Sequence, residues 1–181
     1  MRRFAPLALI ALFAALAVGL LLAHDRRTPA KPLIHASTDF STFYCAGAVV
    51  RSGANPYRVE PLRTCQRTIG ESPNQPEWYV VPAPFPGYML ALFAGLTLLP
   101  PYAAHVLWLF ALFAAVGFAT WALARITAFP PLLIGLLLAT PLAFYDVGFS
   151  EPTPFFLALL VWAAERAQRG AWRACGVLTA L

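Results

Sequence analysis

The stretch Tyr102–Arg125, YAAHVLWLFALFAAVGFATWALAR, decides the fold class of this chain. Its apolar part, Tyr102–Leu123, is long enough to cross the hydrocarbon core of a bilayer, about 30 Å thick, as a single helix. The first charged residue, Arg125, follows where such a helix would reach the polar headgroups. The stretch therefore predicts a transmembrane helix.

The composition of the whole chain agrees with a membrane class. Of 181 residues, 60% are hydrophobic and 12% are charged, and the mean hydropathy is +0.66. Soluble domains are about half apolar and about a quarter charged. The net charge of +5 comes partly from arginines at the ends of apolar segments, and the basic residues form no single patch with interleaved aromatic residues. A nucleic-acid partner is therefore not expected.

Apolar blocks on both sides of this stretch predict an all-α, polytopic bundle of transmembrane helices. Residues 1–23 are expected to be an uncleaved first span with a cytoplasmic amino end, in preference to a cleaved signal peptide, because Phe4–Ala23 follows two arginines and is longer than the apolar core of a usual signal peptide. Residues 24–85 form an extracytoplasmic loop, and residues 86–181 form about four further spans, the last one incomplete. We expect a multi-pass protein of a bacterial inner (plasma) membrane, and the front part of a longer chain.

The apolar segments after the loop leave the topology open. Gly87–Leu99 is short and ends at Pro100-Pro101, so it can either cross the membrane or enter and leave it on one face. A re-entrant segment would place Arg125 and the later arginines in the cytoplasm, as the positive-inside rule prefers. The remaining apolar segments are Leu132–Tyr145, Phe155–Ala164 and Ala174–Leu181.

Two short amphipathic helices are expected in the loop. The first covers Asp39–Arg51. Spacings of three and four place Phe40, Phe43, Tyr44, Gly47 and Val50 on one face of this helix. We expect that aromatic face to lie on the membrane interface. Asn55-Pro56 turns the chain, and a second helix is expected around Pro61–Arg67. Residues 70–86 are too rich in proline for regular structure.

Asp39 is the candidate catalytic residue. A carboxylate held at the membrane surface among aromatic side chains loses hydration, which favours its protonated form and suits it to accept a proton as a general base. An aspartate at this position is also a good N-cap for the helix that follows. The local sequence alone favours the capping role and leaves both alternatives open.

Cys45 and Cys65 lie twenty residues apart in the loop. In an oxidising periplasm they would pair in a disulfide, which is the favoured alternative, and otherwise they would be two free thiols. Cys175 is expected to be a small core residue. The three histidines (His24, His35 and His105) are scattered, so no metal site is predicted, and His105 is expected to bond a neighbouring helix.

Other charged residues have both functional and ordinary explanations. Arg58, Arg63 and Arg67 could hold the phosphate of a lipid headgroup, although a solvated helix face is the commoner explanation. Asp146 and Glu151 flank a turn between spans, where they are either functional or simply solvated.

A longer pattern runs through the loop and the segments after it. It consists of the first span, then Asp39-Phe40-x-x-Phe43-Tyr44-x-Ala46-Gly47, Gly53-Ala54-Asn55-Pro56-Tyr57, Pro82-Ala83-Pro84-Phe85-Pro86, Leu99-Pro100 and a span containing Trp108. In this order, and over roughly residues 4–165, the chain resembles the N-terminal portion of glycosyltransferase family 87. These are membrane mannosyltransferases of the GT-C fold that use a polyprenyl-phosphate donor.

The resemblance implies an inverting hexosyltransferase in which Asp39 takes a proton from an acceptor hydroxyl. That hydroxyl would attack a hexose, by the resemblance mannose, carried on a polyprenyl phosphate. The implied partners are membrane lipid, this donor and a glycan or glycolipid acceptor, without a cofactor. The candidate substrate-binding residues are Tyr44, Asn55, Tyr57, Arg58, Arg63 and Glu151. Of these, Arg58 or Arg63 would stabilise the leaving phosphate.

One departure from the family concerns the turn Gly148-Phe149-Ser150-Glu151, where members often carry Gly-Gln-x-Asn. A second interpretation is a non-catalytic, truncated membrane protein that binds lipid or a partner through its loop, which the abrupt end at Leu181 favours. A transporter subunit is the weaker third interpretation, because the spans hold almost no polar residues at mid-span positions.

Overall fold

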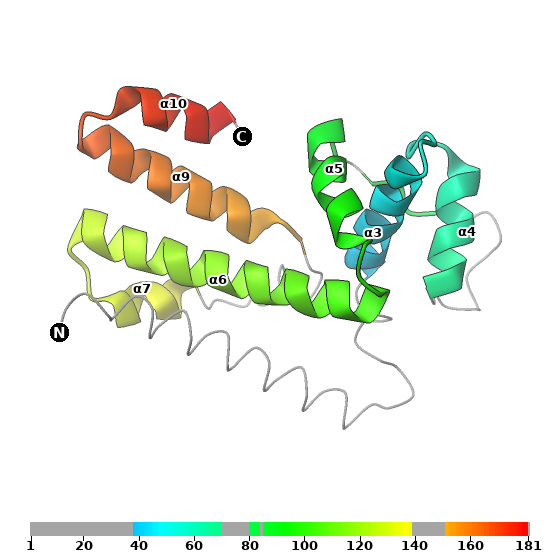
Figure 1. The fold of residues 1–181 in the computed structure, drawn as a ribbon. Helices are drawn as coiled ribbons and strands as arrows, with labels where there is room; N and C mark the ends of the chain where they lie inside the picture. The colour runs from blue at the N-terminus through cyan, green and yellow to red at the C-terminus, as the bar shows by residue number, and fades with distance from the viewer. Residues whose placement is uncertain (1–37, 70–79, 84, 139–150, 181) are drawn as a thin grey trace, which may run out of the picture. The chain divides into compact units, whose positions relative to one another are not determined.

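The structure, a computed structural model, describes residues 38–69, 80–83, 85–138 and 151–180. Over these residues the chain is all-α and contains no strand. The helices are α3 (Thr38–Arg51), α4 (Val59–Ile69), α5 (Gly87–Leu96), α6 (Pro101–Thr127), α7 (Pro131–Leu138), α9 (Thr153–Gln168) and α10 (Trp172–Ala180) (Figure 1). The expected first span, Phe4–Ala23, and Asp146 lie outside the described residues.

Proline and glycine mark several of the helix ends. Both α6 and α7 begin at a proline, whose fixed φ and missing N–H suit the first turn of a helix. Gly53 (φ 76°) and Gly170 (φ 73°) follow the ends of α3 and α9 in the left-handed conformation that stops a helix. These local signals explain why the helix bounds lie close to those expected from the sequence.

The helix α6 has 27 residues and is therefore about 40 Å long. Among the described helices it is the single one that is both long and apolar enough to cross a membrane. The apolar helix α5 has 10 residues, about 15 Å, which is half the thickness of the hydrocarbon core. The structure thus bears out the all-α class, and the other described helices do not by themselves support a polytopic bundle.

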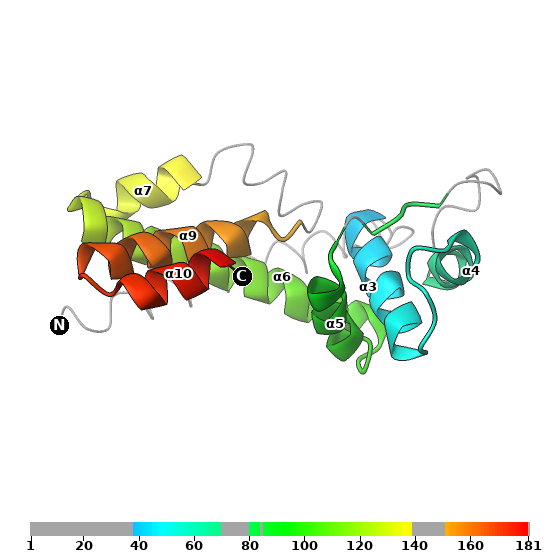
Figure 2. The same cartoon turned by 90° about the horizontal axis from the view of Figure 1, so that it is seen from above.

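The chain forms two compact units, and the division between them falls at Trp108–Leu109. The expected boundary lay at 85/86. That boundary separates a loop from membrane spans and stays a prediction, whereas α5 packs against α3 and therefore belongs to the same compact unit as the loop helices. In this unit α3 lies between α4 and α5, and in the other α9 packs along α10 (Figures 1 and 2). Ala115, Ala119 and Ala158 join α6 to α9 in the core of the second unit.

The helix α3 is the central element of the first unit. Every residue from Phe40 to Gly47 is buried, so α3 is not amphipathic as predicted, and its expected place at the membrane interface stays a prediction. The spacing of the aromatic residues indicated one apolar face, but small residues and hydroxyls such as Thr42 and Ala46 let the opposite side pack as well. The amphipathic helix is α4, which buries Leu62 and Gln66 and exposes its other face.

The helices α3 and α5 approach each other closely at Gly47. A Cβ added at this glycine would lie 2.5 Å from the carbonyl carbon of Phe93 and 2.7 Å from the backbone nitrogen of Ala94. Both are backbone atoms, which cannot rotate away as the end of a side chain can. Glycine is therefore required at this position by the helix contact and not by its own backbone conformation.

Replacing Gly47 with Ala should lower the free energy of unfolding by about 2 kcal/mol, because the added methyl group forces α3 and α5 apart. Gly95→Ala is the matched control, since nothing lies within 4 Å of its added Cβ and alanine is the better helix former. Chemical denaturation of both variants measures the difference. Equal stabilities for the two variants would contradict the close contact.

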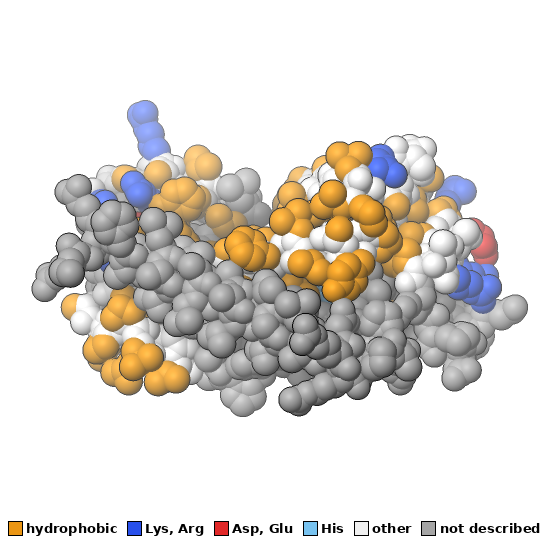
Figure 3. Space-filling model, turned by 60° about the horizontal axis from the view of Figure 1, so that its bottom comes forward, with side chains coloured by type: hydrophobic (Ala, Val, Ile, Leu, Met, Phe, Trp, Pro, Cys, Tyr) orange, Lys and Arg blue, Asp and Glu red, His pale blue; other side chains and the backbone are white. Residues whose placement is uncertain are grey.

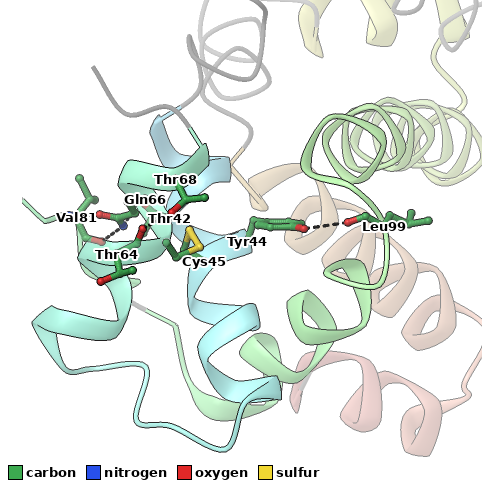
Figure 4. The surroundings of a disulfide bond; sticks show 9 residues. Thr42, Tyr44, Cys45, Thr64, Gln66, Thr68, Val81 and Leu99 are labelled. Carbon is green, nitrogen blue, oxygen red and sulfur yellow. Dashed lines mark hydrogen bonds between the residues drawn. A yellow bond between two sulfur atoms is a disulfide. The ribbon is translucent and has the colours of Figure 1, made fainter. Parts of the chain in front are cut away.

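A disulfide and a buried amide join α3, α4 and the segment that leads into α5 (Figure 4). Cys45 on α3 is bonded to Cys65 on α4, which is one of the two alternatives that the sequence left open. The side chain of Gln66 is fully buried, donates to the carbonyl of Val81 (2.8 Å) and accepts from its N–H (3.3 Å). The amide therefore satisfies both backbone groups of Val81, as a neighbouring strand would.

Candidate functional site

Asp39 lies in the first turn of α3, within the helix and not before it, and it is partly exposed. The next residue, Phe40, is fully buried and stacks on His105 of α6, with ring centroids 4.4 Å apart and planes 19° apart. The ring of Tyr44 lies 6.0 Å from that of Phe40. The first turn of α3, which carries the Asp39 carboxylate, is therefore held in place by the buried rings of Phe40, Tyr44 and His105.

Tyr44 connects α3 to the end of α5. Its hydroxyl donates a hydrogen bond to the carbonyl of Leu99 (2.9 Å) (Figure 4). Two turns further along α3, Arg51 donates to the carbonyl of Thr97 (2.8 Å). Burial raises the pKa of the Tyr44 phenol above its ordinary value, and the nearby Arg51 lowers it to a smaller extent. The phenol is therefore protonated at neutral pH and acts as a donor within the protein.

Replacing Tyr44 with Phe should cost about 1 kcal/mol of stability, because the carbonyl of Leu99 loses its donor while the buried ring is kept. If Tyr44 is structural, as these contacts indicate, the sugar transfer that the family resemblance implies should be unchanged in the variant. Thermal unfolding and a transfer assay on the same preparation measure both effects. A loss of transfer at unchanged stability would instead restore Tyr44 to the substrate site.

Asn55 and Tyr57 form the turn after α3. The side-chain oxygen of Asn55 accepts a hydrogen bond from the N–H of Tyr57 (2.9 Å), a turn closed by its own side chain. The hydroxyl of Tyr57 donates to the carbonyl of Phe85 (2.8 Å), although 59% of this residue is exposed. Both side chains therefore hold the turn against the segment that leads into α5.

The charged candidates are more scattered. Arg58 is exposed at the start of α4, and Arg63 forms an ion pair with Glu60 at 2.8 Å. Glu151 belongs to the other unit, where it accepts a long hydrogen bond (3.4 Å) from the hydroxyl of Thr153. Arg58 and Arg67 are thus the exposed members of the three predicted phosphate ligands, and Arg63 is partly buried.

Aromatic residues of the family pattern contact one another directly or through Phe93, which is not part of the pattern. Phe43 lies 4.4 Å from Phe85 and 5.2 Å from Phe93 between ring centroids, and Phe93 lies 4.8 Å from Trp108. Together with Tyr44 and Tyr57, they link α3, the turn after it, α5 and the start of α6 into one packed group.

Sequence reasoning missed one buried polar residue of this unit, Gln66, and expected another, His105, only to bond a neighbouring helix. Gln66 was not singled out, and its partners on Val81 cannot be deduced from local sequence. In the structure the ring of His105 stacks on the ring of Phe40, the residue that follows Asp39 on α3. The signal for His105 was its isolation in an otherwise apolar segment.

The part of the chain that the structure describes contains no group of three His, Cys, Asp or Glu residues that could hold a metal ion. A comparison of the chain with protein-family models, with curated proteins and with solved structures finds no match.

Proposed function

We propose that this chain is part of a polytopic membrane glycosyltransferase of the GT-C type that moves a hexose, mannose by the resemblance, from a polyprenyl phosphate to an extracytoplasmic acceptor. One observation supports the proposal most strongly. Residues of the family pattern that are distant in sequence contact one another within one unit, Phe43 with Phe85 and Tyr44 with Leu99, and Asp39 lies partly exposed on the same helix as Phe43 and Tyr44.

Exposed apolar residues support a membrane location. On the face drawn in Figure 3, hydrophobic side chains cover much of the surface of the described residues. The helix α7 exposes 51–72% of four leucines, Leu132, Leu133, Leu136 and Leu137. Such a surface is unfavourable in water and favourable against lipid acyl chains. The Cys45–Cys65 disulfide favours an oxidising compartment for the first unit, as expected of an extracytoplasmic loop.

In the proposed reaction the Asp39 carboxylate accepts the proton of the acceptor hydroxyl as its oxygen bonds to the anomeric carbon. The bond from that carbon to the lipid phosphate breaks, and the phosphate leaves with the electron pair, so the configuration inverts. The leaving phosphate gains charge and needs a cation. Arg58 is available for this role, whereas Arg63 would first have to leave Glu60.

Within this proposal Tyr44, Asn55 and Tyr57 position the site and do not bind substrate, because their polar groups are used inside the protein. The same contacts are the observation that favours the second candidate, a non-catalytic membrane protein whose pattern is purely structural. Transfer of labelled hexose by the wild type and by an Asp39 variant separates the two candidates.

A further inference from the structure

Three arginines converge on one carboxylate near the C-terminal ends of α6 and α9. Glu165 is 4% exposed, and its Oε1 lies 2.7 Å from Nη2 of Arg169 and 3.3 Å from Nη1 of Arg125. Arg166 is more distant, with Nη2 at 3.9 Å from Oε2. One negative charge offsets one of the three positive charges, so this arginine cluster (Arg125, Arg166 and Arg169) keeps a net charge of +2.

The cluster also has hydrogen-bond donors to spare. The side chains of its arginines are 36–48% exposed, and the Nε–H of Arg166 is buried with no acceptor among the described residues. A carboxylate with two oxygens cannot satisfy three guanidinium groups of five donors each. An additional anion with several oxygens, such as a phosphate, would take up these donors in the two-pronged geometry that arginine favours.

Two tryptophans lie beside the arginines. The guanidinium of Arg125 is 4.7 Å from the ring centroid of Trp121, and that of Arg166 is 5.8 Å from the ring of Trp162. Cation–π contacts of this kind hold the charged groups in place, and tryptophan is enriched where a membrane meets water. One turn before Arg166, α9 exposes 37% of Trp162.

We propose that the arginine cluster binds the phosphate of an anionic phospholipid headgroup at the membrane surface. The partly exposed Trp162, one helical turn before Arg166, favours a lipid over free phosphate, because acyl chains could cover its ring while the headgroup contacts the arginines. The proposal depends on the membrane location given under Proposed function and not on sugar transfer. It also predicts the orientation of α6 in the membrane: the end that carries Arg125 lies on the side of the membrane where positive residues concentrate.

The test is a titration of the purified full-length chain in a neutral detergent with phosphatidylglycerol, phosphatidylcholine or inorganic phosphate. The rise in thermal midpoint with concentration gives an apparent dissociation constant. We expect phosphatidylglycerol to bind more tightly than phosphatidylcholine. Arg166→Gln should weaken phosphatidylglycerol binding about fivefold, the loss expected for one arginine at an anionic surface.

Arg173→Gln is the matched control, because Arg173 is exposed on α10 and the variant loses the same charge. Its affinity should change less than twofold if the converged geometry, and not the total charge, is what binds. Arg125→Gln is a second variant in case Arg166→Gln does not fold, since Arg169 still pairs with Glu165.

Three results would overturn the proposal: equal affinity for the two lipids, equal losses in Arg166→Gln and Arg173→Gln, or equal stabilisation by inorganic phosphate alone. The last result would assign the cluster to a soluble phosphate and not to a lipid. Asp39→Asn should bind phosphatidylglycerol as the wild type does, so failure of sugar transfer and failure of lipid binding can be told apart.

Discussion

Replacing Asp39 with Asn should lower hexose transfer from a polyprenyl-phosphate donor by about 10²–10⁴-fold, the range that a general base contributes. Asparagine has the shape of aspartate and is tolerated at the start of a helix, but its amide cannot accept the hydroxyl proton. The measurement is the incorporation of radiolabelled sugar in membranes that carry the full-length gene product, at equal expression of wild type and variant.

Glu60→Gln is the control for this experiment, because Glu60 is an exposed carboxylate of the same unit whose described contact is the ion pair with Arg63. It should retain transfer. Intact disulfide content in both variants would show that the fold is preserved. Transfer by Asp39→Asn at the wild-type rate would remove Asp39 from the chemistry. The residue would then serve the first turn of α3, where its charge interacts favourably with the helix dipole.

Removing the disulfide should have the largest effect on stability. A double Cys45→Ala and Cys65→Ala variant should lose about 3 kcal/mol, because the unfolded chain regains the freedom that closure of a 20-residue loop removes. Both residues pack in the core between α3 and α4, so alanine is preferred to serine there. Urea denaturation of the variant, and of the wild type with and without reductant, measures the loss.

The free thiol Cys175 provides the control, since it lies in the other unit and forms no disulfide. Cys175→Ala should denature as the wild type does, and reductant should not destabilise the double variant further. A loss below about 1 kcal/mol in the double variant would mean that burial of Leu62 and Gln66 already holds α4 in place without the covalent link.

Local sequence signals predict the helices of this protein well. The expected helix Asp39–Arg51 differs from α3 by one residue, at its start. The two agree at the C-terminal end, because Gly53 stops the helix there by adopting the left-handed conformation. The long helix α6 and the break before it follow from the apolar stretch and from Pro100-Pro101. These features depend on residues within a few positions of one another, which a single sequence contains.

Contacts between distant segments could not be predicted in the same way. Tyr44 was expected in the substrate site, but its hydroxyl bonds to a carbonyl 55 residues away. Tyr57 bonds to Phe85, 28 residues away, and any carbonyl can accept from a tyrosine. Every residue has a backbone carbonyl, so the amino-acid sequence does not indicate which carbonyl accepts a given hydrogen bond. A tyrosine that bonds the backbone therefore cannot be distinguished by sequence from one that binds a ligand.

The short distance along the chain between Cys45 and Cys65 has a consequence for biosynthesis. A ribosome adds about 5–20 residues per second, so the second cysteine, 20 residues later, follows the first within about 1–4 s. Arg51 donates a hydrogen bond to Thr97, which lies 46 residues after Arg51 and is therefore synthesised later. Both cysteines therefore leave the ribosome before α5 does, so in an oxidising compartment α3 and α4 can be covalently joined before α5 docks onto them.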